Sequence, residues 1–474
     1  MVQEHEVPEI DEAASILPEQ VEVPSTDVHL NKEYVQMLQK ALKADDEEQV
    51  NELLDELHAA DVADILQVLP SGMRVKLIGL SGESFDPAVL SEVEGEAQDD
   101  LYEHMSNDQI ADAITEMDTD DAAYVVGELD AADREEVMRR LATDDRVAIE
   151  ENLSYPVNSA GRLMQRDLVA VPEFWTIGQT IDYLRSDNPD IPTDFYDVFV
   201  VDPAHHLVGV ISLSRVMRTA RKTPVSEVME LEPYSVAADD EQEEVAYQFT
   251  KYHLISVAVV DSSDRLVGVI TVDDVVDVID EEAEHDILAL AGVSEESGIN
   301  ESFIEITKGR FIWLFVNLLT AILASMVIGM FEATIEQMVA LAVLMPIVAS
   351  MGGNAGTQTM TVAVRALATK ELSTNNAFRA INREASAAFL NGAILALISG
   401  GVAVFWFNSV LLGGLFAAAM VFNVFVAGLS GVLVPMALHK MKIDPAISSS
   451  VFVTTITDVV GFFVFLGLAA VFLL

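Results

Sequence analysis

The stretch VFVTTITDVVGFF, residues 451–463, carries one carboxylate, Asp458, inside an almost unbroken apolar run. An acidic side chain near the centre of a membrane-spanning helix costs about 2.5–3.5 kcal/mol on insertion scales, so such residues usually face a protein interior or a water-filled path. Ser450, Thr454 and Asp458 recur every four residues and would share one face of a helix. This polar stripe favours an ion or proton pathway. A carboxyl group that is protonated, or paired with a nearby polar group, is the alternative.

A second apolar stretch, MPIVASMGGNAGTQT at 345–359, mixes helix-weakening and polar residues. Pro346 removes a backbone donor, and the three glycines that follow it weaken the helix further. Asn354 and its polar neighbours add side-chain oxygens. Irregular backbone lining a cavity within the membrane is one interpretation. A packing kink, with close helix contacts through glycine, is the other.

These polar groups lie in two of five apolar segments, each near or above the roughly 20 residues needed to span a bilayer. The segments are 311–331, 337–363, 385–408, 411–437 and 446–473. Lys and Arg precede the first segment and occupy the second-to-third and fourth-to-fifth connections, whereas the other two connections and the C-terminus have none. The positive-inside rule therefore predicts that the N-terminal part is cytoplasmic and the C-terminus is outside.

Charge divides the 474-residue chain at about residue 306. From Thr307 onward there are 8 Lys/Arg and 6 Asp/Glu, whereas the preceding part has 18 and 71. Such acidity argues against nucleic-acid binding, which needs a basic surface, and suits cations. Solubility, or adaptation to a salty habitat, is an equally open reason for much of the charge. The absence of cysteine excludes disulfides and thiolate metal sites. The first residues lack the basic and apolar regions of a secretory signal.

The acidic part has four regions before the membrane segments, and the third of them is an internal repeat. Residues 1–30 have the composition of a disordered segment. Residues 31–155 place apolar residues at three- and four-residue steps, which predicts short amphipathic helices stacked as a superhelix. An acidic helix, clearest at VDDVVDVIDEEAEHDILALAGV (272–293), joins the soluble part to the membrane part.

The internal repeat lies between the predicted superhelix and the acidic helix. VFVVDPAHHLVGVISL (198–213) aligns without gaps on VAVVDSSDRLVGVITV (257–272), and each copy predicts two strands that lead into a helix. The pattern resembles a tandem pair of CBS domains, regulatory modules that often bind adenine nucleotides. The resemblance implies that Gly268, Thr271 and Asp274 contact a nucleotide ribose. In the first copy Arg215 stands where the acid is expected, so the prediction is at most one ATP site per chain, with a purely structural pair as the alternative.

The two membrane motifs together are more specific. Pro and then Gly-Gly-Asn-x-Gly-x-Gln in one span, with Asp-Pro-Ala (444–446) and Thr-Thr-x-x-Asp (454–458) in the last, resemble the MgtE family of magnesium channels. The predicted fold class is thus a multi-domain membrane protein, with an α-helical superhelix, an α/β tandem CBS pair and a five-span α-helical membrane domain. The expected boundaries are 1–30 for the disordered N-terminus, 31–155 for the helical domain, 156–225 and 226–280 for the CBS domains, 281–306 for the connecting helix and 307–474 for the membrane domain.

The resemblance implies a homodimer in a bacterial inner (cell) membrane, with one central pore that imports Mg²⁺. Asp458 maps onto the selectivity aspartate and Asn354 onto a pore-lining asparagine, while Asp444 lies at the cytoplasmic mouth. The resemblance also implies that cytoplasmic Mg²⁺ bridges acidic faces of the cytoplasmic domains and closes the pore. The implied Mg²⁺ ligands on the connecting side are Asp274, Asp277, Glu282 and Asp286. His285 departs from the acid expected there, and Asp118, Asp120 and Asp121 are unmatched candidates in the helical domain.

Two other classes stay open. A proton- or sodium-coupled divalent cation carrier would use Asp458 as its proton site, and a non-transporting membrane receptor would use the CBS pair as a ligand sensor. No nucleophile–base pair, Gly-rich phosphate loop or histidine cluster occurs in the sequence, so an enzyme is not expected.

Overall fold

The computed structural model describes residues 32–473, except 56, 83–84, 187, 189–190, 193–194, 294–302 and 374. The segment 1–30, predicted to be disordered, lies outside the described residues. The chain divides into two compact units, Met1–Tyr155 with Gln165–Asp167, and Pro156–Met164 with Leu168–Leu474. Each unit is described separately.

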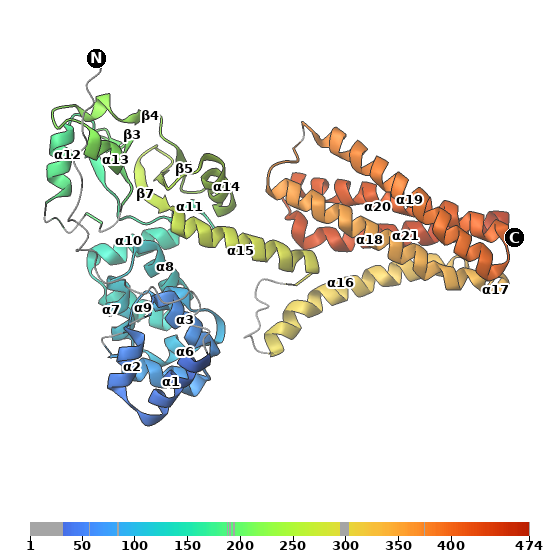
Figure 1. The fold of residues 1–474 in the computed structure, drawn as a ribbon, viewed down its shortest axis with the longest axis horizontal. Coiled ribbons are helices and arrows are strands. Elements are labelled where there is room, and N and C mark those ends of the chain that lie inside the picture. The colour runs from blue at the N-terminus through green and yellow to red at the C-terminus, as the bar shows by residue number, and fades with distance from the viewer. Residues whose placement is uncertain are drawn as a thin grey trace, which may run out of the picture. The chain divides into compact units, whose positions relative to one another are not determined.

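The first unit is helical, as the apolar spacing predicts (Figure 1). Its helices are α1 Lys32–Ala44, α2 Glu47–Leu54, α3 Ala59–Val68, α4 Ser71–Ser81, α5 Val89–Glu92, α6 Gly95–His104, α7 Asn107–Thr115, α8 Thr119–Glu128, α9 Ala131–Arg140 and α10 Thr143–Ser154. Their apolar faces share one buried core. Side chains cap two of these helices: Ser106 and Gln109 form a capping box, and the Asp130 carboxylate accepts from two backbone N–H groups of α9.

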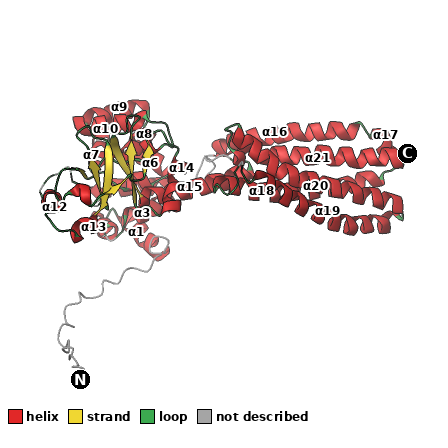
Figure 2. Cartoon of the chain, turned by 90° about the horizontal axis from the view of Figure 1, so that it is seen from above, coloured by secondary structure: helices red, strands yellow, loops and turns green. Residues whose placement is uncertain are grey.

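The second unit begins with the repeated α/β modules. Its elements are α11 Ala160–Leu163, β1 Ala170–Pro172, α12 Ile177–Leu184, β2 Asp197–Val201, β3 Leu207–Ser212, α13 Leu213–Arg218, the 3₁₀ turn η2 Val225–Glu227, β4 Glu230–Leu231, β5 Ser235–Ala237, α14 Gln242–Tyr252, β6 Ser256–Val260 and β7 Leu266–Thr271. The sheet orders are β1-β2-β3-β4 and β5-β6-β7. Figure 2 shows the strands of these modules in yellow. Each module pairs a parallel strand with an antiparallel hairpin, and the hairpins carry a register shift at equivalent positions, Val200/Val201 and Val259/Val260. The predicted repeat is confirmed.

Helix α15, Val272–Ala291, follows β7 directly. Gly292 ends it in the left-handed conformation with φ 71°, a backbone that glycine adopts without strain. Residues 294–302 are outside the described part, so the expected boundary at 306 is untested.

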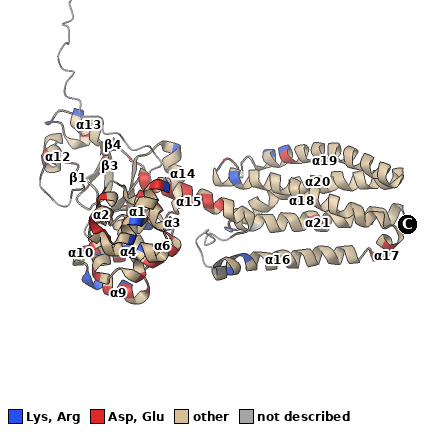
Figure 3. Cartoon of the chain, turned by 60° about the horizontal axis from the view of Figure 1, so that its bottom comes forward, with Lys and Arg blue, Asp and Glu red and all other residues tan. Residues whose placement is uncertain are grey.

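The membrane domain has the five predicted spans. These are α16 Phe303–Gly329, α18 Ala340–Ala368, α19 Ala377–Phe407, α20 Val410–Lys440 and α21 Pro445–Phe472, with a short helix α17 Glu332–Gln337 between the first two. By length and composition all five helices can cross a membrane. Lys and Arg gather near helix ends, and the helix middles are almost free of charge (Figure 3).

The irregular backbone expected around 345–359 is not found, because α18 is helical throughout with Pro346 inside it. The glycines instead allow close helix contacts, which was the alternative interpretation. A Cβ on Gly352 would lie 2.2 Å from Asn423 Nδ2 of α20, and a Cβ on Gly356 would lie 2.5 Å from Val453 Cγ1 of α21. Neighbouring helices thus approach α18 where it has no side chains.

Gly352→Ala is expected to destabilise the membrane domain by about 1–3 kcal/mol, the usual cost of overpacking a filled site. The added methyl group would clash with the amide of Asn423. The measurement is the thermal unfolding temperature of the protein in detergent. Gly353→Ala is the matched control, because nothing lies within 4 Å of a Cβ at Gly353. Equal unfolding temperatures for the two variants would contradict the packing.

Candidate ion pathway and mouth cluster

The polar stripe lies on α21 as predicted. Asp458 is half-buried, and Thr454, one turn before it, is exposed. The Thr454 hydroxyl donates to the Ser450 carbonyl at 2.7 Å, so the threonine satisfies its donor within the helix and keeps oxygen lone pairs free. The stripe therefore presents oxygen atoms along one helix face.

Two sets of contacts between antiparallel helices define the depth of Asp458. Gly356 of α18 faces Val453 and Thr457 of α21, while Gly352 and Gly461 both close onto Asn423. Asn354 lies between Gly352 and Gly356 on α18. Asp458 lies between Thr457 and Gly461, the residues of α21 that take part in the same two sets of contacts. The predicted pore asparagine and the predicted selectivity aspartate are therefore at the same depth.

The face of α18 that carries Asn354 is uncovered in the described part of the chain. Asn354, Thr357 and Gln358 are all exposed. Amide and hydroxyl groups at this depth are costly against lipid, so such a face borders protein or water.

Asn423 was missed by the sequence analysis. It is completely buried on α20, and its Nδ2 donates to the Val348 carbonyl of α18 at 2.9 Å. Its Oδ1 is buried with no partner among the described residues. Because Gly352 and Gly461 pack against the same amide, Asn423 joins the two helices that carry Asn354 and Asp458. An asparagine inside an apolar segment is a recognisable signal, although its partners are not.

Charged side chains gather where α15 meets the start of α21, and we call Glu282, His285, Asp286 and Asp444, with Glu243 of α14, the mouth cluster. His285 lies between two carboxylates: Nε2 is 3.6 Å from Asp444 Oδ2 and Nδ1 is 3.9 Å from Glu282 Oε2. Both contacts are ion pairs only when the ring is protonated. Asp444 also caps α21, where its Oδ1 accepts from the Ala446 N–H at 2.7 Å.

Each carboxylate of the mouth cluster disfavours the ionised form of its neighbours. Burial raises the pKa of Asp286, and the negative charge of Asp444 raises it further. Burial likewise raises the pKa of Glu243, with added contributions from Glu282 and Asp286. Both desolvation and repulsion therefore disfavour ionised carboxylates in the mouth cluster, and a bound cation would stabilise them.

Glu243 was also missed, because nothing in the sequence places α14 beside α15. The structure links them by a hydrogen bond of 3.0 Å from Gln242 Nε2 to Glu282 Oε1. Lys370, after α18, pairs with Glu244 and lies 4.1 Å from the centroid of the Tyr247 ring. The second CBS module, the connecting helix and the membrane domain therefore meet at this cluster.

The four acids predicted on the connecting side do not form one group. Asp274 and Asp286 are twelve residues apart on α15, about 18 Å along the helix axis, so no single ion contacts both. Asp277 belongs to the first half of the helix, and its pKa is raised by burial and then by Asp273 and Asp280. Among the described residues, no three Asp, Glu or His side chains are close enough to hold a metal ion.

The three predicted nucleotide residues lie where β7 enters α15. The Thr271 hydroxyl donates to Asp274 Oδ2 at 2.8 Å, so the aspartate already caps its own helix. Gly268 is buried in β7, and in the first module a Cβ on Gly209 would lie 2.7 Å from Met229 Sδ. Arg215, at the position equivalent to Asp274, pairs with Glu230 at 3.2 Å.

Five apolar helices with a half-buried acid in the last, preceded by a CBS pair and an acidic connecting helix, define a multi-pass membrane transport protein with cytoplasmic N-terminal domains. Family models agree with this class. A divalent cation transporter model (MgtE) matches residues 345–468, an MgtE intracellular N domain model matches 57–158, and a CBS domain model matches 160–222 and 225–281.

The magnesium transporter MgtE of Thermus thermophilus is 32% identical over 450 residues, which cover 92% of this chain and 98% of that protein. That of Enterococcus faecalis is 34% identical over 325 residues, 69% of this chain and 71% of that protein. A solved structure titled as the cytosolic domain of the Mg²⁺ channel MgtE in complex with ATP is 31% identical, covering 52% of this chain and 99% of its own, with a TM-score of 0.48. The chain belongs to the MgtE family of magnesium transporters, and Mg²⁺ is its transported ion.

Proposed function

We propose that the protein is a Mg²⁺-selective channel that imports Mg²⁺ and is closed by cytoplasmic Mg²⁺. The observation that carries this proposal is Asp458, a half-buried carboxylate at the depth of Asn354 in the middle of an apolar helix bundle. Mg²⁺ binds oxygen octahedrally and loses its waters reluctantly. Carboxylate, amide and hydroxyl oxygens along α18 and α21 suit an ion that keeps most of its water.

The pore is proposed to form between two copies of the chain. Support comes from the exposed polar face of α18, which needs protein or water against it. A homodimer that joins these faces would bring both Asp458 carboxylates to one axis. An odd number of spans, together with cytoplasmic N-terminal domains, would put the C-terminus outside.

The proposed gate is the end of α15. Ala289 packs in a buried cluster with Met360 and Val364 of α18 and with Ala446 and Val453 of α21. A helix end seated on both candidate pore helices is suited to act as a plug. Mg²⁺ bound at the mouth cluster would neutralise its mutually repelling acids and hold α15 in this position. Ligands from a second copy of the chain would complete the coordination.

The channel proposal is tested by uptake into vesicles that contain the purified protein. An imposed negative internal voltage should drive Mg²⁺ entry without any gradient of H⁺ or Na⁺. Entry that requires either gradient would instead identify a coupled carrier, with Asp458 as the proton site. No uptake under any condition would favour a receptor that uses the CBS pair as a ligand sensor.

We also propose that ATP binds at Gly268, Thr271 and Asp274, at one site per chain. The support is the acid at the start of α15, where the first module has the ion-paired Arg215 instead.

Asp274→Ala is expected to weaken ATP binding, because it removes the proposed ribose acceptor. Calorimetry with ATP on the full chain measures the affinity and the number of sites. Asp273→Ala is the control, since this exposed neighbour carries the same charge outside the motif. An affinity unchanged by Asp274→Ala, or two equal sites per chain, would refute the single-site proposal.

A further inference from the structure

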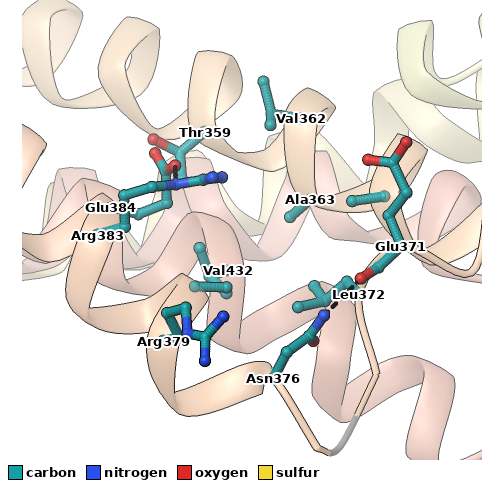
Figure 4. A pocket seen from close by; sticks show the side chains of 12 residues that line it. Thr359, Val362, Ala363, Glu371, Leu372, Asn376, Arg379, Arg383, Glu384 and Val432 are labelled. Carbon is teal, nitrogen blue, oxygen red and sulfur yellow. Dashed lines mark hydrogen bonds and ion pairs between the residues drawn. The ribbon is translucent and has the colours of Figure 1, made fainter.

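A cavity of about 290 Å³ lies apart from the ion pathway, where the end of α18, the loop after it and the start of α19 meet (Figure 4). Val362 and Ala363 of α18, Leu372 of the loop and Val432 of α20 form its apolar wall. The polar stripe and the mouth cluster contribute no residue to it. Drug-sized ligands occupy cavities of about 300–1,000 Å³, so this one suits a small polar group.

The cavity contains two positive and two negative side chains from different elements. Arg383 and Glu384 neutralise each other, with Arg383 Nε 3.3 Å from Glu384 Oε1. Arg379 of α19 and Glu371 of the loop form no ion pair, either with each other or elsewhere in the described part of the chain. The cavity therefore offers one uncompensated cation and one uncompensated anion, separated in space.

The cavity lies at the membrane boundary. It is built from the ends of two spanning helices, at the end of the bundle that carries the Lys and Arg residues. Val362, in its wall, is 53% exposed, and Phe378, beside Arg379, is 77% exposed. The exposed apolar ring of Phe378 gives a lipid acyl chain a surface beside the cavity, from which the headgroup can enter.

We propose that this cavity binds the headgroup of an amine-bearing phospholipid. The phosphate would pair with Arg379, whose planar guanidinium favours phosphate oxygens. The primary ammonium would donate to the Glu371 carboxylate, and an acyl chain would run along Phe378. A purely anionic headgroup leaves Glu371 unpaired and repelled, whereas a choline headgroup has no N–H to donate.

The test uses the full-length protein, purified in detergent and stripped of lipid. Phosphatidylethanolamine, phosphatidylcholine and phosphatidylglycerol are added separately, and the thermal unfolding temperature is measured. Phosphatidylethanolamine is expected to raise that temperature most. Arg379→Gln should lose most of the shift, and Glu371→Gln should abolish the preference over phosphatidylglycerol. Lys440→Gln, which removes a cation at the same end of the bundle but outside the cavity, should change neither.

Equal shifts with all three lipids, the largest shift with phosphatidylglycerol, or an undiminished response of Arg379→Gln would overturn the proposal. Soluble glycerophosphoethanolamine and inorganic phosphate distinguish a lipid from a free solute. If either stabilises the protein as much as the lipid does, the lipid assignment fails. Native mass spectrometry of the wild type provides a readout that does not depend on variant folding, and a bound lipid population not enriched in phosphatidylethanolamine would equally exclude it.

Discussion

Replacing Asp458 with asparagine is expected to reduce Mg²⁺ uptake by vesicles that contain the protein to the level of empty vesicles. Asparagine keeps the size of the side chain and removes its charge. The apolar helices around it supply no other charge at this depth, since the remaining Asp and Glu of the membrane domain lie at helix ends and loops. A divalent ion would then cross a low-dielectric region without a compensating anion, and that cost is high. Asp458→Ala should fail in the same way.

The control for Asp458 is Glu332→Gln, which removes an exposed acid from α17. It should transport as wild type does. Both Asp458 variants should unfold at or above the wild-type temperature, because removal of a half-buried carboxylate removes a desolvation cost. Folded Asp458→Asn protein that transports Mg²⁺ at the wild-type rate would end the pore assignment.

Neutralising the acids of the connecting helix is expected to flatten the response of transport to internal Mg²⁺. The variant combines Asp274→Asn, Asp277→Asn, Glu282→Gln and Asp286→Asn, and so removes both the repulsion and the groups that bind the ion. Allosteric couplings are typically about 1–3 kcal/mol. Burial, and then neighbouring carboxylates, raise the pKa values of Asp277, Asp286 and Glu243, and a bound cation would relieve the repulsive part. Wild-type flux should fall as internal Mg²⁺ rises, whereas flux through the variant should stay constant.

The mouth cluster allows a sharper version of this experiment. Glu282→Gln with Asp286→Asn should account for most of the flattening, because these two acids lie beside Asp444 and Glu243. Asp280→Asn with Glu284→Gln removes the same charge from α15 at exposed positions and should leave the response intact. Mg²⁺ should also protect the cytoplasmic part of the wild type from proteolysis. Equal protease sensitivity with and without Mg²⁺ would mean that the acidic charge serves solubility or salt adaptation rather than Mg²⁺ sensing. The pore proposal would be unaffected by that result.

Much of the architecture could be predicted from the sequence because its causes are local. A spanning helix needs only a sufficiently long apolar run, so all five spans were predictable, although their ends extend beyond the apolar residues by up to about two turns (α19 begins at Ala377, not 385). The gapless repeat at 198–213 and 257–272 predicted two equivalent hairpins, and the shared register shift follows from it. Asp458 was identifiable because a carboxylate in such a run carries a cost that function must explain.

Only the tertiary structure decided which distant groups meet. The glycines after Pro346 were compatible with broken backbone or with tight packing, and the choice depended on Asn423 and Val453, which lie about 70 and 100 residues further along the chain. The roles of Asn423 and Glu243 likewise depend on helices that are far apart in the sequence but pack against each other. By itself the sequence determined the helices and strands, the five spans and the charged residue in the last one. Side-chain packing between elements far apart in the sequence determined that Asn354 and Asp458 share one depth, and that the acids of α14, α15 and α21 form one cluster despite their mutual repulsion.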